Sequence, residues 1–198
     1  MLENNPKQER TFLMVKPDGV RRGLVGDIIS RLEQRGLKII ALKMIRPSRE
    51  QIDGHYPKDH HWITRLGEKT MGAYQKYGRD AIKDMGTDKP EEIGPMVREW
   101  ILNFMTSGPA VKAIIEGVHA VDMVRKLCGH TIPSVAEMGT IRGDYSVDSP
   151  ALANAEKRAL YNLVHASETQ EEAEHEIKYW FGPEDIHDYK RSDEDVMI

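Results

Sequence analysis

A chain of 198 residues with 39% hydrophobic and 30% charged side chains is long enough for one domain with a substantial core. Its formal net charge of −4 argues against a dominant nucleic-acid-binding surface, and no apolar run approaches the roughly 20 residues that a membrane-spanning helix needs. The single cysteine, Cys128, cannot form a disulfide within the chain, and the polar segment 1–10 has no apolar signal core, so a cytoplasmic location is expected.

The first part of the chain predicts two strands and two helices. Residues 11–16 contain a short apolar run typical of a buried strand, and the Pro-Asp-Gly sequence at 17–19 is expected to end it in a turn. Residues 24–35 repeat apolar side chains with helical spacing, and residues 37–45, rich in Ile and Leu, predict a second strand. Ser48, with Gln three residues later, indicates a capping box that starts a short helix.

The middle of the chain changes character at about residue 57. Up to residue 97 it combines glycine, many charges and scattered aromatic side chains. Pro90, followed by two acids, indicates the start of a helix that continues towards residue 105. Residues 111–118 predict a third strand or core segment, and residues 119–128 predict a helix with one apolar side.

The last part of the chain predicts a loop over residues 131–143, a helix over 148–161 and a brief final strand over 161–165. Ser167, with Gln three residues later, is expected to cap a final helix whose apolar stripe holds Ala173, Ile177 and Trp180. The order of strands and helices favours an α+β sandwich with a mostly antiparallel sheet.

Three separated motifs resemble those of the nucleoside diphosphate kinase family. They are Lys16-Pro17-Asp18-Gly19-Val20, Gly139-Thr140-Ile141-Arg142-Gly143-Asp144, and the segment Asn162–Glu168, which contains His165. The resemblance implies a ferredoxin-like sandwich, in which helices cover a four-stranded antiparallel sheet. It also implies a single domain over residues 1–198 with a helical insertion at about 57–93 and a shorter insertion at about 146–158, because the chain is longer there than the family usually is.

The same resemblance implies an activity and its partners. The γ-phosphate of a nucleoside triphosphate would pass to a nucleoside diphosphate by a ping-pong mechanism through phosphorylated His165. Mg²⁺ is the implied cofactor, held by the nucleotide phosphates and not by protein ligands. Nucleoside di- and triphosphates are the implied partners, together with further copies of the chain, with a hexamer first and a tetramer or dimer as alternatives. No membrane or nucleic-acid partner is expected.

Each implied site residue takes its role from its place in a motif. His165 is the implied nucleophile, since a neutral imidazole nitrogen attacks phosphorus while an acceptor holds the other nitrogen. The residues implied to assist or orient it are Lys16, Glu176, Ser167 and Tyr56. Fixed cations and donors stabilise the charge of the transferring group. The residues implied to hold the nucleotide in this way are Lys16, Arg125, Thr131, Arg142 and Asn162.

Other functions have less support in the sequence. The chain lacks the Gly-rich loop of P-loop kinases and the dinucleotide-binding fingerprint. His55, His60 and His61 lie near one another, but no cysteine or well-spaced carboxylate completes a metal site. The main alternative is a catalytically silent nucleotide-binding or regulatory member of the same fold, which the presence of His165 and Lys16 disfavours.

The longer insertion leaves two questions open. The family typically stacks the nucleotide base against a Phe, where this chain has Val97, and Trp62 is a candidate replacement from the insertion. The insertion itself is expected to form a helical cover over the nucleotide entrance or a subunit contact. The alternative is a solvated elaboration without a function.

Overall fold

The computed structural model describes residues 8–197 and centres on a sheet of four antiparallel strands. In spatial order these are β2 (Lys38–Ile45), β3 (Ala110–Gly117), β1 (Glu9–Val15) and β4 (Val164–Ala166). The central strands β1 and β3 are also the most deeply buried, as their nearly continuous apolar sequences predict. Most of the polar segment 1–10 lies outside the described residues.

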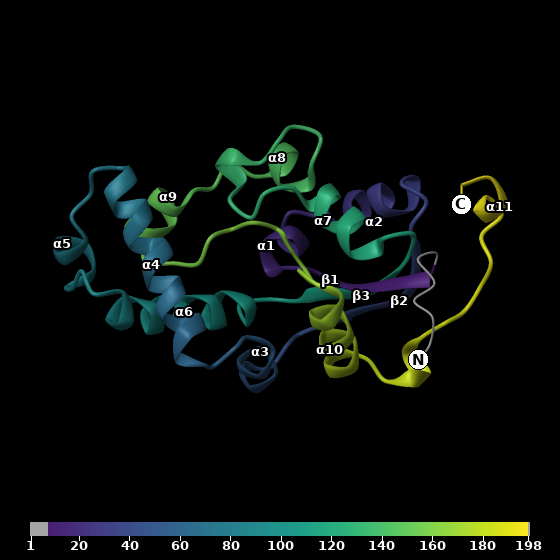
Figure 1. Cartoon of the computed structure of the whole chain (residues 1–198), viewed down its shortest axis with the longest axis horizontal. Helices are drawn as coiled ribbons and strands as arrows, with labels where there is room; N and C mark the ends of the chain where they lie inside the picture. Colours follow the sequence, from purple (N-terminus) through teal and green to yellow (C-terminus); the bar gives the residue numbers. More distant parts are fainter. Residues whose placement is uncertain (1–7, 198) are drawn as a thin grey trace.

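Helices cover both faces of the sheet, which confirms the predicted ferredoxin-like α+β sandwich (Figure 1). On one face lie α2 (Val25–Gln34), α7 (Ala120–Cys128) and α8 (Ile141–Tyr145). On the other face lie α3 (Arg49–His55), α6 (Pro90–Met105) and α10 (Gln170–Trp180). The remaining short elements are α1 (Pro17–Arg21), η2 (Pro133–Val135), η3 (Pro183–Asp185) and α11 (Glu194–Met197). Within residues 8–197, no helix is both long and apolar enough to cross a membrane.

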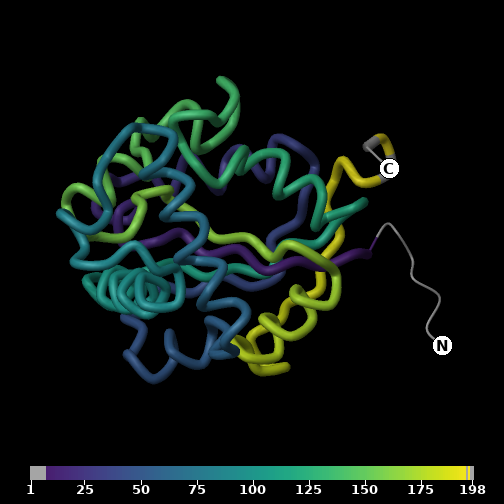
Figure 2. Tube along the Cα trace, turned by 60° about the vertical axis from the view of Figure 1, so that its left-hand side comes forward, coloured from purple at the N-terminus to yellow at the C-terminus, as the bar shows by residue number. Residues whose placement is uncertain are grey.

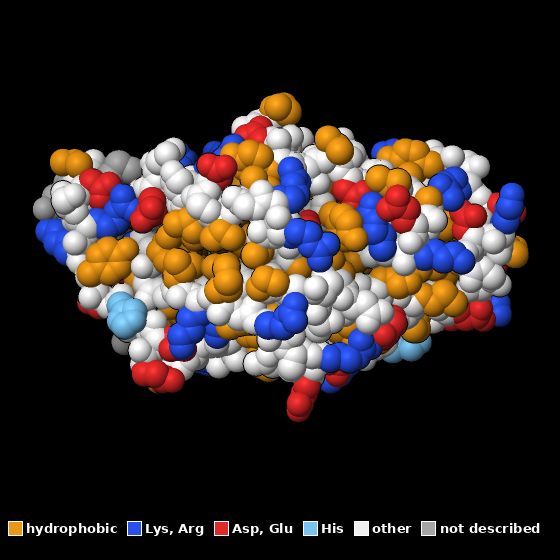
Figure 3. Space-filling model, turned by 180° about the vertical axis from the view of Figure 1, so that it is seen from behind, with side chains coloured by type: hydrophobic (Ala, Val, Ile, Leu, Met, Phe, Trp, Pro, Cys, Tyr) orange, Lys and Arg blue, Asp and Glu red, His pale blue; other side chains and the backbone are white. Residues whose placement is uncertain are grey.

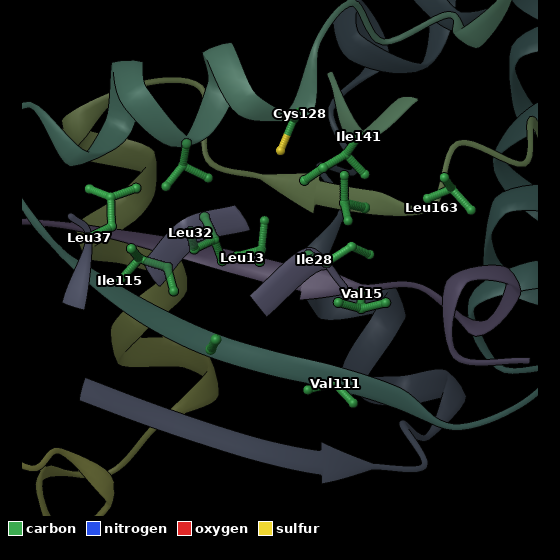
Figure 4. Close-up of a cluster of buried hydrophobic side chains, with 13 residues drawn as sticks. Leu13, Val15, Ile28, Leu32, Leu37, Val111, Ile115, Cys128, Ile141 and Leu163 are labelled. Carbon is green, nitrogen blue, oxygen red and sulfur yellow. The ribbon is translucent and has the colours of Figure 1, made fainter. Parts of the chain in front are cut away.

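Strand β1 contributes to both hydrophobic cores because successive side chains point to opposite faces of a sheet. Leu13 and Val15 pack into the core beneath α2, α7 and α8 (Figure 4). Phe12 and Met14 pack into the core beneath α3, α6 and α10. All four side chains are fully buried, and each such burial contributes about 1.5–3 kcal/mol. The strand therefore places its C-terminal end, and the lysine that follows it, rigidly between the two helical layers.

The longer extra stretch forms a helical projection. It holds α4 (His60–Lys76), α5 (Ala81–Met85) and the start of α6, and it lies at the end of the molecule away from α11 (Figure 1). Asp59 caps α4 by accepting a hydrogen bond from the backbone N–H of Trp62 at 2.8 Å. Helix α9 (Pro150–Ala155), from the shorter extra stretch, contacts α4, so the two stretches pack against each other (Figure 2).

Two glycines let α4 and α6 approach each other closely. A Cβ at Gly67 would overlap the carbonyl group of Pro90, and a Cβ at Gly94 would overlap that of Ile63.

We therefore expect Gly67→Ala to lower the free energy of unfolding by about 1–3 kcal/mol. Gly72→Ala is the matched control in α4, since open space surrounds it, and alanine should stabilise the helix there by about 0.5–1 kcal/mol. Thermal unfolding gives the change in Tm for each variant. Changes of the same sign in Gly67→Ala and Gly72→Ala would contradict this account of the packing.

Two predictions of local structure, the turn at 17–19 and the helix over 148–161, are partly wrong. A proline explains the first difference, and a side-chain ion pair contributes to the second. The Pro-Asp-Gly sequence at 17–19 begins α1 instead of a turn, since proline at the first helical position lacks only an N–H that would be unpaired there. Of the helix predicted over 148–161, only α9 forms. The backbone becomes left-handed at Lys157 (φ 51°), and Arg158 pairs with Asp148 at 2.6 Å, which closes the segment into a loop.

Three further boundaries differ from prediction. The loop predicted over 131–143 contains η2 and the start of α8, which Thr140 caps. The last strand begins only at Val164, because Leu163 has a φ of 68° that interrupts extended backbone. Thr169 and not Ser167 caps α10. The remaining predicted strands and helices are confirmed to within a few residues.

Candidate active site

His165 lies on the edge strand β4, opposite Met14 of β1. Its neighbours Val164 and Ala166 pack into the core on the α7 side. Because side chains alternate along a strand, the imidazole points to the opposite face, where its ring lies 6.0 Å from that of Phe12. The side chain is 17% exposed, so it is held by packing and remains accessible from solvent.

A carboxylate fixes the orientation of this imidazole. Nε2 of His165 lies 2.7 Å from Oε1 of Glu176, and the hydroxyl of Ser167 donates to Oε2 of the same carboxylate at 2.5 Å. Both oxygens of Glu176 are therefore engaged. With the proton of the neutral ring on Nε2, the lone pair is on Nδ1. Burial, followed by the charge of Lys16, lowers the pKa of His165 to about 3, so the ring is neutral at ordinary pH.

Lys16 leaves the end of β1 and enters the same site. Its Nζ donates to Oδ1 of Asn162 at 2.7 Å, and the amide of Asn162 in turn donates to the carbonyl of Thr131 at 3.0 Å. Burial and, after it, repulsion by Arg142 lower the pKa of Lys16 to about 8. Two cations thus converge beside a neutral imidazole, which is an arrangement suited to an anion.

Arg142 is buried and holds the segment that carries His165. Its guanidinium donates to the carbonyls of Gly129 at 2.7 Å, Val164 at 2.8 Å and Asn162 at 3.1 Å. A guanidinium has five N–H donors, so these three bonds leave two for an anionic ligand. Burial lowers the pKa of Arg142. The side chain therefore combines a structural contact with the capacity to bind phosphate.

The Lys-Pro-Asp-Gly motif holds the backbone before His165 in a strained conformation. Leu163, with its φ of 68°, donates its N–H to Asp18 at 3.1 Å and accepts a hydrogen bond from the N–H of Lys16 at 2.8 Å. A Cβ at Gly19 would lie 3.1 Å from the carbonyl oxygen of Leu163. Left-handed backbone costs a leucine about 1–2 kcal/mol, so these contacts keep β4, and with it His165, in place.

The other predicted site residues contact neighbours of the residues described above. Arg125 is exposed on α7 and pairs with Glu168 at 3.3 Å. Thr131 is exposed, and its carbonyl reaches the site through Asn162. Tyr56 follows α3 with its ring centroid 4.8 Å from that of His55, and burial raises the pKa of its hydroxyl.

His55 and Trp180 belong to the site although the sequence did not single them out for it. The side chain of His55 is only 1% exposed, and its ring lies 4.8 Å from that of His165. Trp180 donates its indole N–H to Nδ1 of His55 at 3.2 Å. His60 and His61, which lie near His55 in the sequence, are exposed on α4 and are not part of this group. In the sequence, the signal that could have placed His55 in the site was its position directly before Tyr56, a predicted site residue.

A model of the family described as nucleoside diphosphate kinase matches residues 9–63 and 95–186. The chain belongs to the nucleoside diphosphate kinase family. Residues 64–94, which the family model leaves unmatched, contain most of α4 and all of α5. The enzyme is thus a phosphotransferase that moves the γ-phosphate of a nucleoside triphosphate to a nucleoside diphosphate, as members of this family do. It binds nucleotides and uses a divalent metal ion.

Relatives of this chain share nearly its whole length. A nucleoside diphosphate kinase of Pyrobaculum aerophilum is 51% identical over 90% of this chain and 97% of its own. The crystal structure of an NDP kinase from that organism has a TM-score of 0.88 and 49% identity, covering 91% of this chain and all of the other. A transition-state mimic of the enzyme from Borrelia burgdorferi, with vanadate and ADP, has a TM-score of 0.74 and 35% identity, covering 94% and 95%.

Proposed function

We propose that Nδ1 of His165 is the atom that carries the phosphate between the two nucleotides. The observation behind this assignment is the hydrogen bond from Nε2 to Glu176, which leaves the lone pair of a neutral ring on Nδ1. Nδ1 attacks the γ-phosphorus, an N–P bond forms, and the bond from phosphorus to the bridging oxygen of the diphosphate breaks. Nε2 keeps its proton, and Glu176 stabilises the positive charge that develops on the ring.

The cations of the site balance the charge of the transferring group. Lys16 and the free donors of Arg142 would bind phosphate oxygens, while Asn162 orients Lys16 and offers its amide to the ribose hydroxyls. Ser167 holds the second oxygen of Glu176. Arg125 would exchange its partner Glu168 for a phosphate. Thr131 would also contribute to phosphate binding. A donor placed in this way commonly contributes about 10²–10³ in rate.

Mg²⁺ is the divalent ion that we propose for this reaction. It prefers oxygen ligands and keeps several waters, whereas the metal-type donors gathered near His165 in residues 8–197 include two imidazoles. The residues therefore fit an ion that is held by the nucleotide phosphates. When bound there, Mg²⁺ would supply positive charge that offsets the negative charge of the phosphate oxygens.

A pulse–chase experiment tests the phosphoenzyme. Incubation with γ-labelled ATP and Mg²⁺ should give an acid-labile, alkali-stable phosphoprotein, and added GDP should remove the label as GTP. Absence of label on a folded protein would favour the catalytically silent alternative. Label that GDP does not remove would contradict the ping-pong mechanism.

The insertion is part of this proposal because it contacts Tyr56. The ring of Trp62 in α4 stacks on that of Tyr56 at 6.0 Å and 30°. Arg98 of α6 donates to Asp53 at 2.7 Å and to the carbonyl of Pro57 at 3.4 Å, which fixes the segment between the two aromatic residues. The projection would therefore hold Tyr56 against the active site and place Trp62 at the nucleotide entrance.

Substitution of Trp62 measures this contact. We expect Trp62→Ala to lower kcat/KM by about 2–10-fold, the equivalent of one aromatic pair, and Trp62→Phe to restore most of it. Tyr77→Ala is the control, because Tyr77 is an exposed aromatic residue at the far end of α4. Steady-state kinetics with ATP and a diphosphate acceptor give the comparison. An equal loss in both alanine variants would contradict a specific role for Trp62.

We also propose a homo-oligomer, with a hexamer as the expected form and a tetramer or dimer as alternatives. Strand β2 is an edge of the sheet, and it exposes 49% of Leu42 and 63% of Met44. Figure 3 shows hydrophobic side chains gathered on one face of the molecule. An exposed apolar edge strand is a surface that a second chain covers. Light scattering should give six chains of 22.6 kDa, and a monomer would refute the proposal.

The cytoplasmic location stays a prediction.

A further inference from the structure

Two histidines and a glutamate meet in the site within the reach of a single ion. One ligand atom from each of His55, His165 and Glu176 lies within 4.8 Å of the others. Oε1 of Glu176 lies between the two rings, 2.7 Å from Nε2 of His165 and 3.4 Å from Nδ1 of His55. Tetrahedral zinc with bonds of about 2.1 Å places neighbouring ligand atoms about 3.4 Å apart. The three residues thus need only small movements to share an ion.

The chemistry of these donors selects a class of metal. Two imidazoles and one carboxylate match the ligand set of catalytic zinc sites, whereas Mg²⁺ favours oxygen ligands alone. We propose that His55, His165 and Glu176 bind a zinc-like divalent transition metal ion, and that this ion inhibits phosphate transfer. The site is distinct from that of the Mg²⁺ carried by the nucleotide.

Inhibition follows from the atoms that the ion would occupy. The ion takes the lone pair of Nε2 of His165, so the proton of the neutral ring moves to Nδ1, which then has no lone pair with which to attack phosphorus. His165 is also no longer free to move towards the γ-phosphate. The fourth position of a tetrahedral ion remains for water or a phosphate oxygen.

Trp180 competes with the ion for one of these ligand atoms. Its indole N–H donates to Nδ1 of His55, which leaves Nε2 of that ring as a buried group without a hydrogen-bond partner among the described residues. Because a neutral ring has one lone pair in its plane, Nδ1 binds either the indole or the ion. Removal of the indole N–H should therefore strengthen metal binding, which a merely structural role of Trp180 would not do.

The test measures zinc binding directly, in competition with a chromogenic chelator, on full-length protein freed of metal with EDTA. Wild type should bind one Zn²⁺ per chain. His55→Gln should weaken binding at least about 10-fold, and Trp180→Phe should tighten it about 2–10-fold, the equivalent of one neutral hydrogen bond. The double variant His60→Gln/His61→Gln is the matched control, since both side chains are exposed, and it should bind as wild type does. Circular dichroism confirms that each variant is folded.

Activity provides a second measurement. Zn²⁺ should inhibit wild type in excess Mg²⁺, and EDTA should reverse the inhibition. Zinc affinity that is unchanged in His55→Gln, or lost in the His60/His61 variant, would overturn the proposal, as would weaker binding in Trp180→Phe. The chelator measurement requires no turnover, so its result is independent of whether the pulse–chase experiment detects a phosphoenzyme.

Discussion

His165→Ala should abolish phosphate transfer, lowering kcat by at least about 10⁴-fold, because no other group then forms the covalent intermediate. The labelled phosphoprotein should disappear in the same variant. The imidazole contacts Glu176, Phe12 and His55, so its removal should lower Tm by a few degrees while the protein stays folded. Loss of label with an intact fold would assign the chemistry to this imidazole.

The control for that experiment is His175→Ala, on α10 next to Glu176. His175 is exposed, and its ring lies 6.4 Å from that of Tyr179, so the variant should keep the label and nearly full activity. Label that persists in His165→Ala would contradict the assignment. The nearest other imidazole is that of His55, and the double variant His55→Ala/His165→Ala would show whether that ring had accepted the phosphate.

The sheet and its main helices follow from local patterns that tertiary contacts do not override. Each of these patterns favours a single local structure. They are the apolar run of β1, which favours a strand, and the helical spacing of α2 and the acids at the start of α6, which favour helices. Two of the errors occur where a side-chain contact acts on the backbone. The Arg158–Asp148 pair ends α9 early, and Asp18 stabilises the left-handed Leu163, which shortens β4. Asp18 and Leu163 lie 145 positions apart, so no local pattern contains both. Arg158 and Asp148 are 10 positions apart, which is not a spacing that brings side chains together on a helix.

The site shows the same limit. Motif resemblance identifies His165, Lys16 and Glu176, which the structure brings together, although their roles remain predictions. It does not identify His55 or Trp180, because a histidine and a tryptophan 125 positions apart form no pattern in sequence. Their hydrogen bond exists only because α3 and α10 pack side by side on one face of the sheet. Spatial assembly, and not propensity, thus determines the surroundings of the nucleophile.

Lys16→Met should lower catalytic activity and raise the stability of the fold. We expect kcat/KM at pH 7 to fall about 10²–10³-fold, since a positioned cation is lost from the charged transition state. In wild type, kcat/KM reports groups of the free enzyme, and the pKa of about 8 predicts a decline above pH 8 as Lys16 loses its proton. The variant should lack this alkaline decline.

Stability should change in the other direction. The pKa of Lys16 lies below its ordinary value of 10.5, so the charged form is less favourable in the folded protein than in the unfolded chain. This destabilisation is complete below about pH 8 and disappears as pH rises towards 10.5. Lys16→Met should therefore have a higher Tm than wild type at pH 7, with the difference narrowing towards pH 10. A lower Tm at pH 7 would show that the Lys16–Asn162 hydrogen bond outweighs burial of the charge. Lower activity with higher stability would instead show that the lysine is kept for binding phosphate at the expense of the fold.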